Sequence, residues 1–222
     1  QVTSLGPDNS PLRHSGTRPV TLAAGERLSV GSPQEETALI LVRGAVQLES
    51  SALGSGTLGP RHSFITERAH AVYVAPGDSA GVEASEPSEL MIATASVSPA
   101  PDLVSRWIRP EDQTPKQVGQ DNWSRQVTAV LDGDFPARML VLGETVNAPG
   151  NWSSSPPHKH DGEHAGDDPH DELDAVKRIW ERVLPIQEPI QCLSPKEPRR
   201  KRPYRERAPA SKSRDWPRVP VL

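Results

Sequence analysis

The chain has 222 residues, of which 34% are hydrophobic and 4% aromatic, so it can form one large domain or two small ones around a modest core. No run of residues approaches the roughly 20 apolar positions that a membrane-spanning helix requires, and the single cysteine, Cys192, excludes an internal disulfide. A chain without disulfides is typical of a reducing compartment. We therefore expect a cytoplasmic protein with no membrane partner.

The net charge of −4 hides two regions of opposite sign. Val176 and the residues after it contain 13 Lys and Arg residues and 5 Asp and Glu residues, a charge of +8. The residues before Val176 contain 12 Lys and Arg residues and 24 Asp and Glu residues, a charge of −12. The sequence thus predicts an acidic body that carries a basic tail.

Short strands separated by turns are predicted for the first hundred residues. Apolar segments rich in β-branched residues alternate with Gly, Pro and Asp turn signals about every 8–12 residues. The expected strands lie within 18–30, 36–50 with a break at Gly44, 70–84 and 88–97. This spacing favours an all-β sandwich or barrel, with a mixed α+β domain as the alternative.

A polar, proline-rich segment, 97–120, interrupts this pattern and is predicted to connect two β units. Strand patterns resume at 124–131 and 137–146. We therefore divide the chain into a first β domain, a connecting segment, the start of a second β domain and a basic tail, at 1–100, 101–125, 126–175 and 176–222.

The tail has eight prolines and neither glycine nor histidine. Residues 172–184 have the apolar spacing of one amphipathic helix, while the rest can bury little surface and is expected to be disordered. Its positive charge would allow it to bind phosphate groups. The acidic body and the lack of a recognised nucleic-acid-binding pattern argue against nucleic acid as a partner.

The stretch GNWSSSPPHKHD, residues 150–161, carries the strongest chemical signal. Side chains two residues apart on a strand point to the same face, so His158 and His160 would present two imidazoles to one spot. Imidazoles with a carboxylate bind a divalent metal in this way. The alternative is a pair of surface or hydrogen-bonded histidines, because His-x-His alone is a weak signal.

This stretch, preceded by SRQV at 124–127, resembles the signature of the 5-deoxy-glucuronate isomerase family of bacterial inositol catabolism. Eleven of its twelve positions agree, and Ser155 stands where an aromatic residue is usual. Looser similarity in TLAAGE, ALILVRGAVQL and AVYVAPGDSAGVEA extends the resemblance over about residues 18–175.

The resemblance implies a bicupin: two jelly-roll barrels in one chain, the second holding a divalent metal ion of the Zn or Mn type. It implies an aldose–ketose isomerisation of 5-deoxy-D-glucuronate to 2-deoxy-5-keto-D-gluconate, with a small sugar acid as ligand. His158 and His160 would be the first two metal ligands. Arg125 would bind the carboxylate of the sugar acid, with a structural ion pair as the alternative role.

The sequence departs from the family after this motif. Ala175 falls where the family has its glutamate ligand, so Glu172 or Asp174 would have to substitute, and no histidine follows His170 to supply the fourth ligand. We therefore expect an incomplete second barrel with a weakly bound or absent metal, and we interpret the change near residue 175 as an altered reading frame or gene end.

Two functions remain open from the sequence. One is the isomerase; the other is a catalytically inactive cupin relative that binds a sugar acid or has a structural role. The sequence also allows either a monomer or a homo-oligomer.

Overall fold

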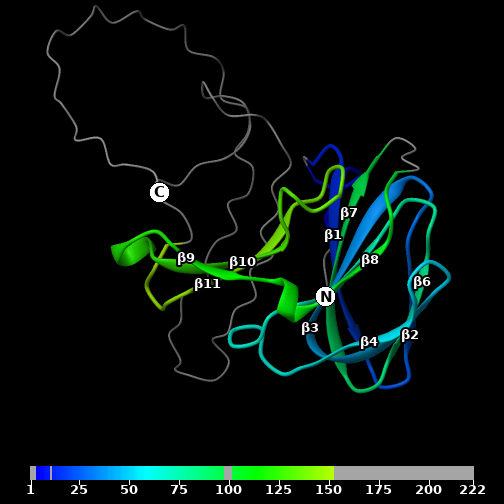
Figure 1. Ribbon diagram of the computed structural model, residues 1–222, viewed down its shortest axis with the longest axis horizontal. Coiled ribbons are helices and arrows are strands. Elements are labelled where there is room, and N and C mark those ends of the chain that lie inside the picture. Colours follow the sequence, from blue (N-terminus) through cyan, green and yellow to red (C-terminus); the bar gives the residue numbers. More distant parts are fainter. Residues whose placement is uncertain (1–3, 11, 98–101, 153–222) are drawn as a thin grey trace, which may run out of the picture. The chain divides into compact units, whose positions relative to one another are not determined.

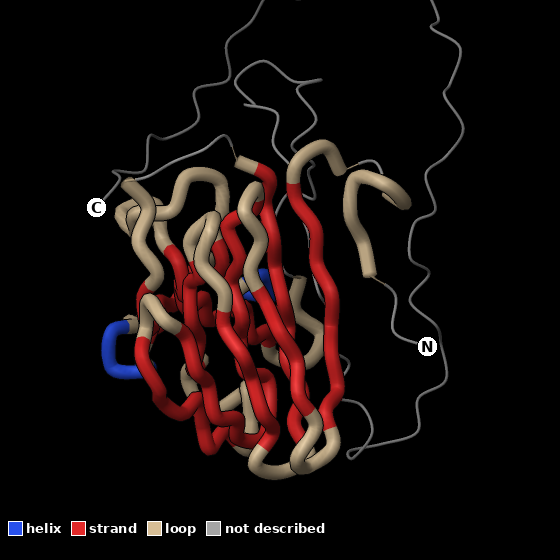
Figure 2. The backbone as a smooth tube through the Cα atoms, turned by 90° about the vertical axis from the view of Figure 1, so that its right-hand side faces the viewer, coloured by secondary structure: helices blue, strands red, loops and turns tan. Residues whose placement is uncertain are grey.

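The computed structural model describes residues 4–10, 12–97 and 102–152, and these contain β-strands and two short 3-10 helices but no α-helix (Figures 1 and 2). The strands are β1 (Ser15–Leu22), β2 (Arg27–Val30), β3 (Glu35–Ser50), β4 (Gly54–Arg61), β5 (His70–Val74), β6 (Ala80–Ala84), β7 (Ser88–Ser96), β8 (Arg106–Ile108), β9 (Pro115–Val118), β10 (Arg125–Leu131) and β11 (Leu142–Asn147). The 3-10 helices are η1 (Pro110–Asp112) and η2 (Asp121–Trp123). The predicted all-β class is confirmed.

The long strand β3 belongs to two layers of one antiparallel barrel (Figure 1). Its first half lies between β7 and β5, in the order β1-β7-β3-β5-β8. Its second half pairs with β4 on one side and β6 on the other, and β6 in turn pairs with β2. The break expected at Gly44 is therefore a bend within one strand.

The bend has a local cause. Gly44 has a φ of +98°, a conformation that L side chains rarely adopt, and a Cβ there would lie 2.8 Å from the carbonyl oxygen of Pro87. The hydroxyl of Ser88 accepts a hydrogen bond from the Ala45 backbone N–H at 3.1 Å. The start of β7 thus packs directly onto the bend of β3.

The space between the two layers is filled by apolar side chains. Leu39 and Leu41 from the first half of β3 and Val46 and Leu48 from the second half are all fully buried there. The buried members of this first core are Leu22, Val30, Leu39, Leu41, Val46, Leu48, Leu58, Val72, Val74, Ala80, Val82, Ala84, Leu90 and Ile92. The interior of this barrel is a packed core.

A second core lies on the other face of the β3–β5–β7 layer. There Ala38, Ile40 and Tyr73 pack with Val130, Leu131 and Leu140 of the chain's later part. The strand expected at 137–146 begins only at Leu142. The backbone N–H groups of 138, 139 and 140 instead donate to the buried Glu36 carboxylate at 2.6–2.9 Å.

The predicted connecting segment, 97–120, contributes two strands rather than a plain connection. β8 extends the barrel sheet beside β5, and β9 joins β10 and β11 in a separate three-stranded sheet of order β11-β10-β9. These three strands are what the described residues contain of the second β unit. No described helix has the length and apolar character needed to cross a membrane.

Candidate functional site

The interior of the first barrel offers no site for a metal or a polar ligand. Its lining is the apolar core, and within the described residues no three His, Cys, Asp or Glu side chains are grouped closely enough to hold a metal ion. The polar and charged side chains that could bind a ligand lie outside this apolar core.

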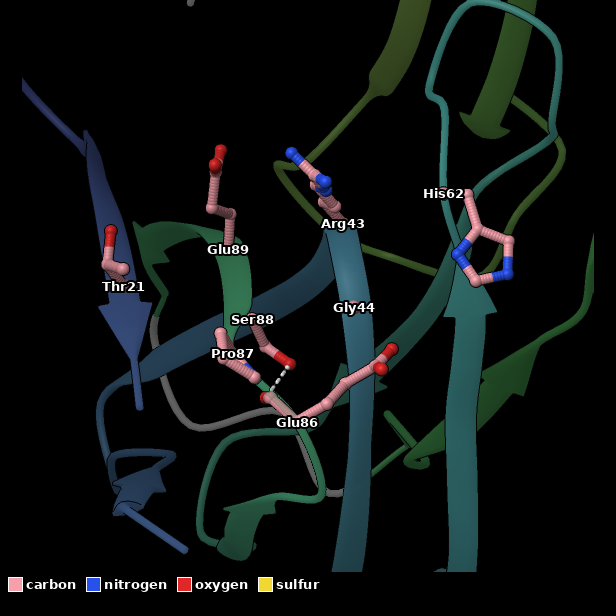
Figure 3. A pocket seen from close by; sticks show the side chains of 8 residues that line it. All are labelled: Thr21, Arg43, Gly44, His62, Glu86, Pro87, Ser88 and Glu89. Carbon is pink, nitrogen blue, oxygen red and sulfur yellow. Dashed lines mark hydrogen bonds between the residues drawn. The ribbon is translucent and has the colours of Figure 1, made fainter. Parts of the chain in front are cut away.

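A hollow of about 400 Å³ lies beside the bend of β3 (Figure 3). Arg43 stands opposite Glu89 in the β3–β7 register, and His62 and Glu86 line the same hollow. One guanidinium, one imidazole and two carboxylates give it charges of both signs. Because both signs are present, the hollow favours neither an anionic nor a cationic ligand.

A second hollow, of about 500 Å³, is lined by His70 together with Glu67, Arg68 and Glu111. Burial lowers the pKa of His70 below its ordinary value of 6.5, and the positive charges of Arg61 and Arg109 lower that pKa further. The imidazole is thus held neutral near pH 7. Because charged side chains of both signs surround it, this hollow is also unselective.

The predicted metal ligands His158, His160, Glu172 and Asp174 lie outside the described residues, so they remain predictions. Arg125, the predicted substrate-binding residue, is the first residue of β10 and is half-buried. Its guanidinium donates to the carbonyl oxygen of Trp123 at 3.3 Å. No carboxylate of the described residues forms an ion pair with it.

The structure brings Arg125 and the start of the 150–161 motif to one end of the three-stranded sheet. A turn closes by a 3.0 Å hydrogen bond from the Asn151 N–H to the Ala148 carbonyl, with Gly150 at a φ of +84°. The Asn151 side chain then donates to the Ser124 carbonyl at 2.7 Å, and the Trp152 N–H donates to the Asn122 carbonyl at 2.8 Å. The SRQV segment at 124–127 and the start of the 150–161 motif, which together carry the family resemblance, are therefore neighbours in space.

Further polar side chains share the sheet face of Arg125. Asn147 is its direct partner on β11. In the next row, Val127 stands between Lys116 of β9 and Thr145 of β11. Sequence reasoning missed Lys116, Thr145 and Asn147, since a face shared by three strands depends on a register that the sequence does not state.

The opposite face of β11 is tied to the first barrel. Glu144 binds the guanidinium of Arg61 at 2.8 and 2.7 Å. Arg61 is completely buried, while the Glu144 side chain keeps 20% of its surface exposed. This ion pair fixes which face of β11 turns toward the barrel and leaves Thr145 and Asn147 on the other.

Comparison with known proteins gives a consistent result. Residues 1–174 match the KduI/IolB family. Proteins named 5-deoxy-glucuronate isomerase from Halalkalibacterium halodurans and Shouchella clausii are 29% and 30% identical, over 72% and 69% of this chain and 59% and 57% of their own lengths. The chain thus spans less than two thirds of these relatives.

A crystal structure of an IolB-like protein from Salmonella typhimurium LT2 is similar as well. It is 26% identical, with a TM-score of 0.66, and the alignment covers 74% of this chain and 62% of that one. The match confirms the predicted cupin fold, and the family match includes the barrel, the three-stranded sheet and the 150–161 motif. The chain belongs to the KduI/IolB family.

Proposed function

We propose that this chain is an aldose–ketose isomerase that converts 5-deoxy-D-glucuronate to 2-deoxy-5-keto-D-gluconate in myo-inositol catabolism. The observation that carries the proposal is the GNWSSSPPHKHD stretch inside the residues that match the family. The relatives named 5-deoxy-glucuronate isomerase support it. The lone cysteine and the lack of an internal disulfide suit a reaction in the cytoplasm.

In this proposal His158 and His160 hold a divalent ion of the Zn or Mn type, and Glu172 or Asp174 supplies the carboxylate ligand. Imidazole and carboxylate form a donor set suited to either metal. When bound, such an ion polarises the substrate carbonyl and stabilises negative charge on its oxygen. The described residues supply no competing metal cluster.

The chain's own part is to bind and orient the sugar acid. Arg125 suits the substrate carboxylate, since a guanidinium binds carboxylates through two parallel hydrogen bonds, and in the described residues it forms no ion pair. A carboxylate held at one end leaves the carbonyl end free to be presented to a base that moves the proton between adjacent carbons.

The test is elemental analysis and an isomerase assay on the purified full chain. The variant is His158→Ala with His160→Ala, and the matched control is His62→Ala, an exposed histidine of the first barrel. The proposal predicts that the chain, incubated with excess Zn or Mn because its site is incomplete, takes up about one divalent ion and forms product, and that both are lost in the double variant and kept in the control. A chain with neither metal nor isomerisation would overturn the proposal.

One observation favours a second candidate. Ala175 replaces the family's glutamate ligand and no histidine follows His170, a pattern that suits a non-catalytic cupin relative which binds a sugar acid. Such a protein would bind D-glucuronate in the presence of a chelator and would show no isomerisation with any added divalent metal.

A further inference from the structure

We propose that one face of the β9–β10–β11 sheet is the surface that binds the sugar acid, with Lys116 and Arg125 for its carboxylate and Thr145 and Asn147 for its hydroxyl groups. We call this surface the Arg125 face; it comprises Lys116, Val118, Arg125, Val127, Thr145 and Asn147. The choice of a sugar acid rests on the proposed function, whereas the surface itself is inferred from the sheet.

The register places these side chains together. Arg125 lies between Val118 on one neighbouring strand and Asn147 on the other. Directly opposite residues of an antiparallel pair have Cβ atoms about 5 Å apart on the same face. Arg125 and Asn147 are therefore within reach of one small ligand, with Lys116 and Thr145 in the adjoining row.

The charge of the Arg125 face is positive, although the body of the chain is strongly acidic. Lys116 and Arg125 both lie on it, and none of its six residues is Asp or Glu. Glu144, the acidic residue of β11, lies on the opposite face and is bound to Arg61. A face with two cations and no counter-charge among its own residues is complementary to a carboxylate.

Asn147 gives a second, independent indication of a ligand. Its Oδ1 atom is buried and has no hydrogen-bond donor among the described residues. Leaving a buried acceptor unpaired is costly, so such atoms are usually satisfied by a partner. A hydroxyl group of a ligand held by Arg125 on the same face would supply that donor once the atoms that cover Oδ1 move aside.

The position of the Arg125 face suits the proposed site. Ser124, directly before Arg125, holds the Asn151 side chain at 2.7 Å, and Asn147 directly precedes the turn that starts the 150–161 motif. A ligand on the Arg125 face would therefore lie at the same end of the sheet as the first residues of that motif.

The experiment measures binding of D-glucuronate to the chelator-treated full chain by titration calorimetry, with D-glucose as the sugar that lacks the carboxylate. The variants are Arg125→Gln, Lys116→Gln and Asn147→Ala. Gln126→Ala is the matched control, because Gln126 follows Arg125 on β10 and points to the opposite face. Thermal unfolding of each variant verifies folding.

We expect D-glucuronate to bind more tightly than D-glucose. Arg125→Gln should weaken D-glucuronate binding by about tenfold or more, as for loss of a hydrogen bond to a charged group. Asn147→Ala should weaken it by about fivefold, as for loss of a neutral hydrogen bond. The effect of Lys116→Gln should be intermediate, and the control should bind like the unmodified chain. Equal binding of both sugars, or variants that bind D-glucuronate like the unmodified chain, would overturn the assignment.

The isomerase assay separates this inference from the proposed function. Variants of the Arg125 face should raise KM and leave kcat nearly unchanged, since they alter ground-state binding. An inactive chain whose D-glucuronate binding depends on Arg125 and Asn147 would refute the isomerase and support the Arg125 face. An active chain whose KM is unchanged in these variants would support the isomerase and refute the Arg125 face.

Discussion

The guanidinium of Arg61, at the end of β4, binds both carboxylate oxygens of Glu144, in β11, at 2.8 and 2.7 Å. Arg61 also donates to the backbone carbonyls of Leu41 and Glu67 at 2.7 and 2.8 Å and is completely buried. This pair joins strands of the barrel and of the three-stranded sheet. It thereby orients the strand that carries Thr145 and Asn147.

Breaking this pair should destabilise the fold strongly. Glu144→Gln leaves a buried guanidinium without its counter-charge, which costs about 3 kcal/mol of unfolding free energy. The control is Arg27→Gln, because the Arg27–Glu83 pair has side chains 78% and 45% exposed and exposed pairs contribute under about 1 kcal/mol. Urea unfolding of both variants measures the difference, and equal losses would contradict the assigned role.

The bend of β3 should tolerate no side chain. In Gly44→Ala the new Cβ would meet the Ser88 hydroxyl and the Pro87 carbonyl at a φ of +98°, so strain and overpacking together should cost at least about 2 kcal/mol. Gly77→Ala is the matched control, since Gly77 has a φ of +90° but nothing within 4 Å of a Cβ, and should cost about 1 kcal/mol. Thermal unfolding that ranks the two variants equally would refute the packing argument.

Most strands of the barrel could be predicted from the sequence, but the course of β3 through both layers could not. Leu39 and Leu41 face the same core as Val46 and Leu48, although strict alternation would place the second pair on the other face. The register shifts between Leu41 and Arg43 and between Gly44 and Val46, and a one-residue shift exchanges the two faces. Only the tertiary pairing reveals this.

The sequence points to some residues of the proposed site, and their roles stay predictions. Arg125 and the 150–161 motif were identified from the sequence, but β9 was not, because PKQV is short, begins with proline and contains one apolar β-branched residue. The segment 137–141 is predicted as the start of the strand 137–146. Its N–H groups are bound by Glu36, about a hundred residues earlier, a long-range contact that periodicity cannot show.

Tyr73 should make the fold sensitive to alkaline pH. Burial raises the pKa of this phenol well above 10.0, and its hydrogen bond to the Glu36 carboxylate at 2.7 Å raises that pKa further. The unfolded chain therefore loses this proton first, and stability present below pH 10 should fall as the pH rises beyond it.

The variant Tyr73→Phe tests this dependence. It should cost about 1.5 kcal/mol at pH 7, as for a hydrogen bond to a charged group, and should lose less stability than the unmodified chain between neutral and alkaline pH. Tyr204, the chain's other tyrosine, is present in both proteins and cancels in the comparison. Parallel curves of unfolding free energy against pH would contradict the assignment.

His70 should make the stability of the fold sensitive to acid pH. Because burial and the nearby Arg61 and Arg109 lower the pKa of this imidazole below 6.5, the unfolded chain takes up the proton at a higher pH than the folded chain. The contribution of His70 to stability is therefore present above pH 6.5 and lost as the pH falls through the folded-state pKa.

Replacing His70 by glutamine should remove this part of the acid dependence, so the difference in unfolding free energy between the two proteins should shrink as the pH falls below 6.5. The other histidines are common to both chains and do not enter the difference. An NMR titration of the His70 ring gives a direct measurement of its pKa in the folded state. A midpoint at or above 6.5 would contradict the lowered pKa that burial, together with the guanidinium groups of Arg61 and Arg109, gives this imidazole.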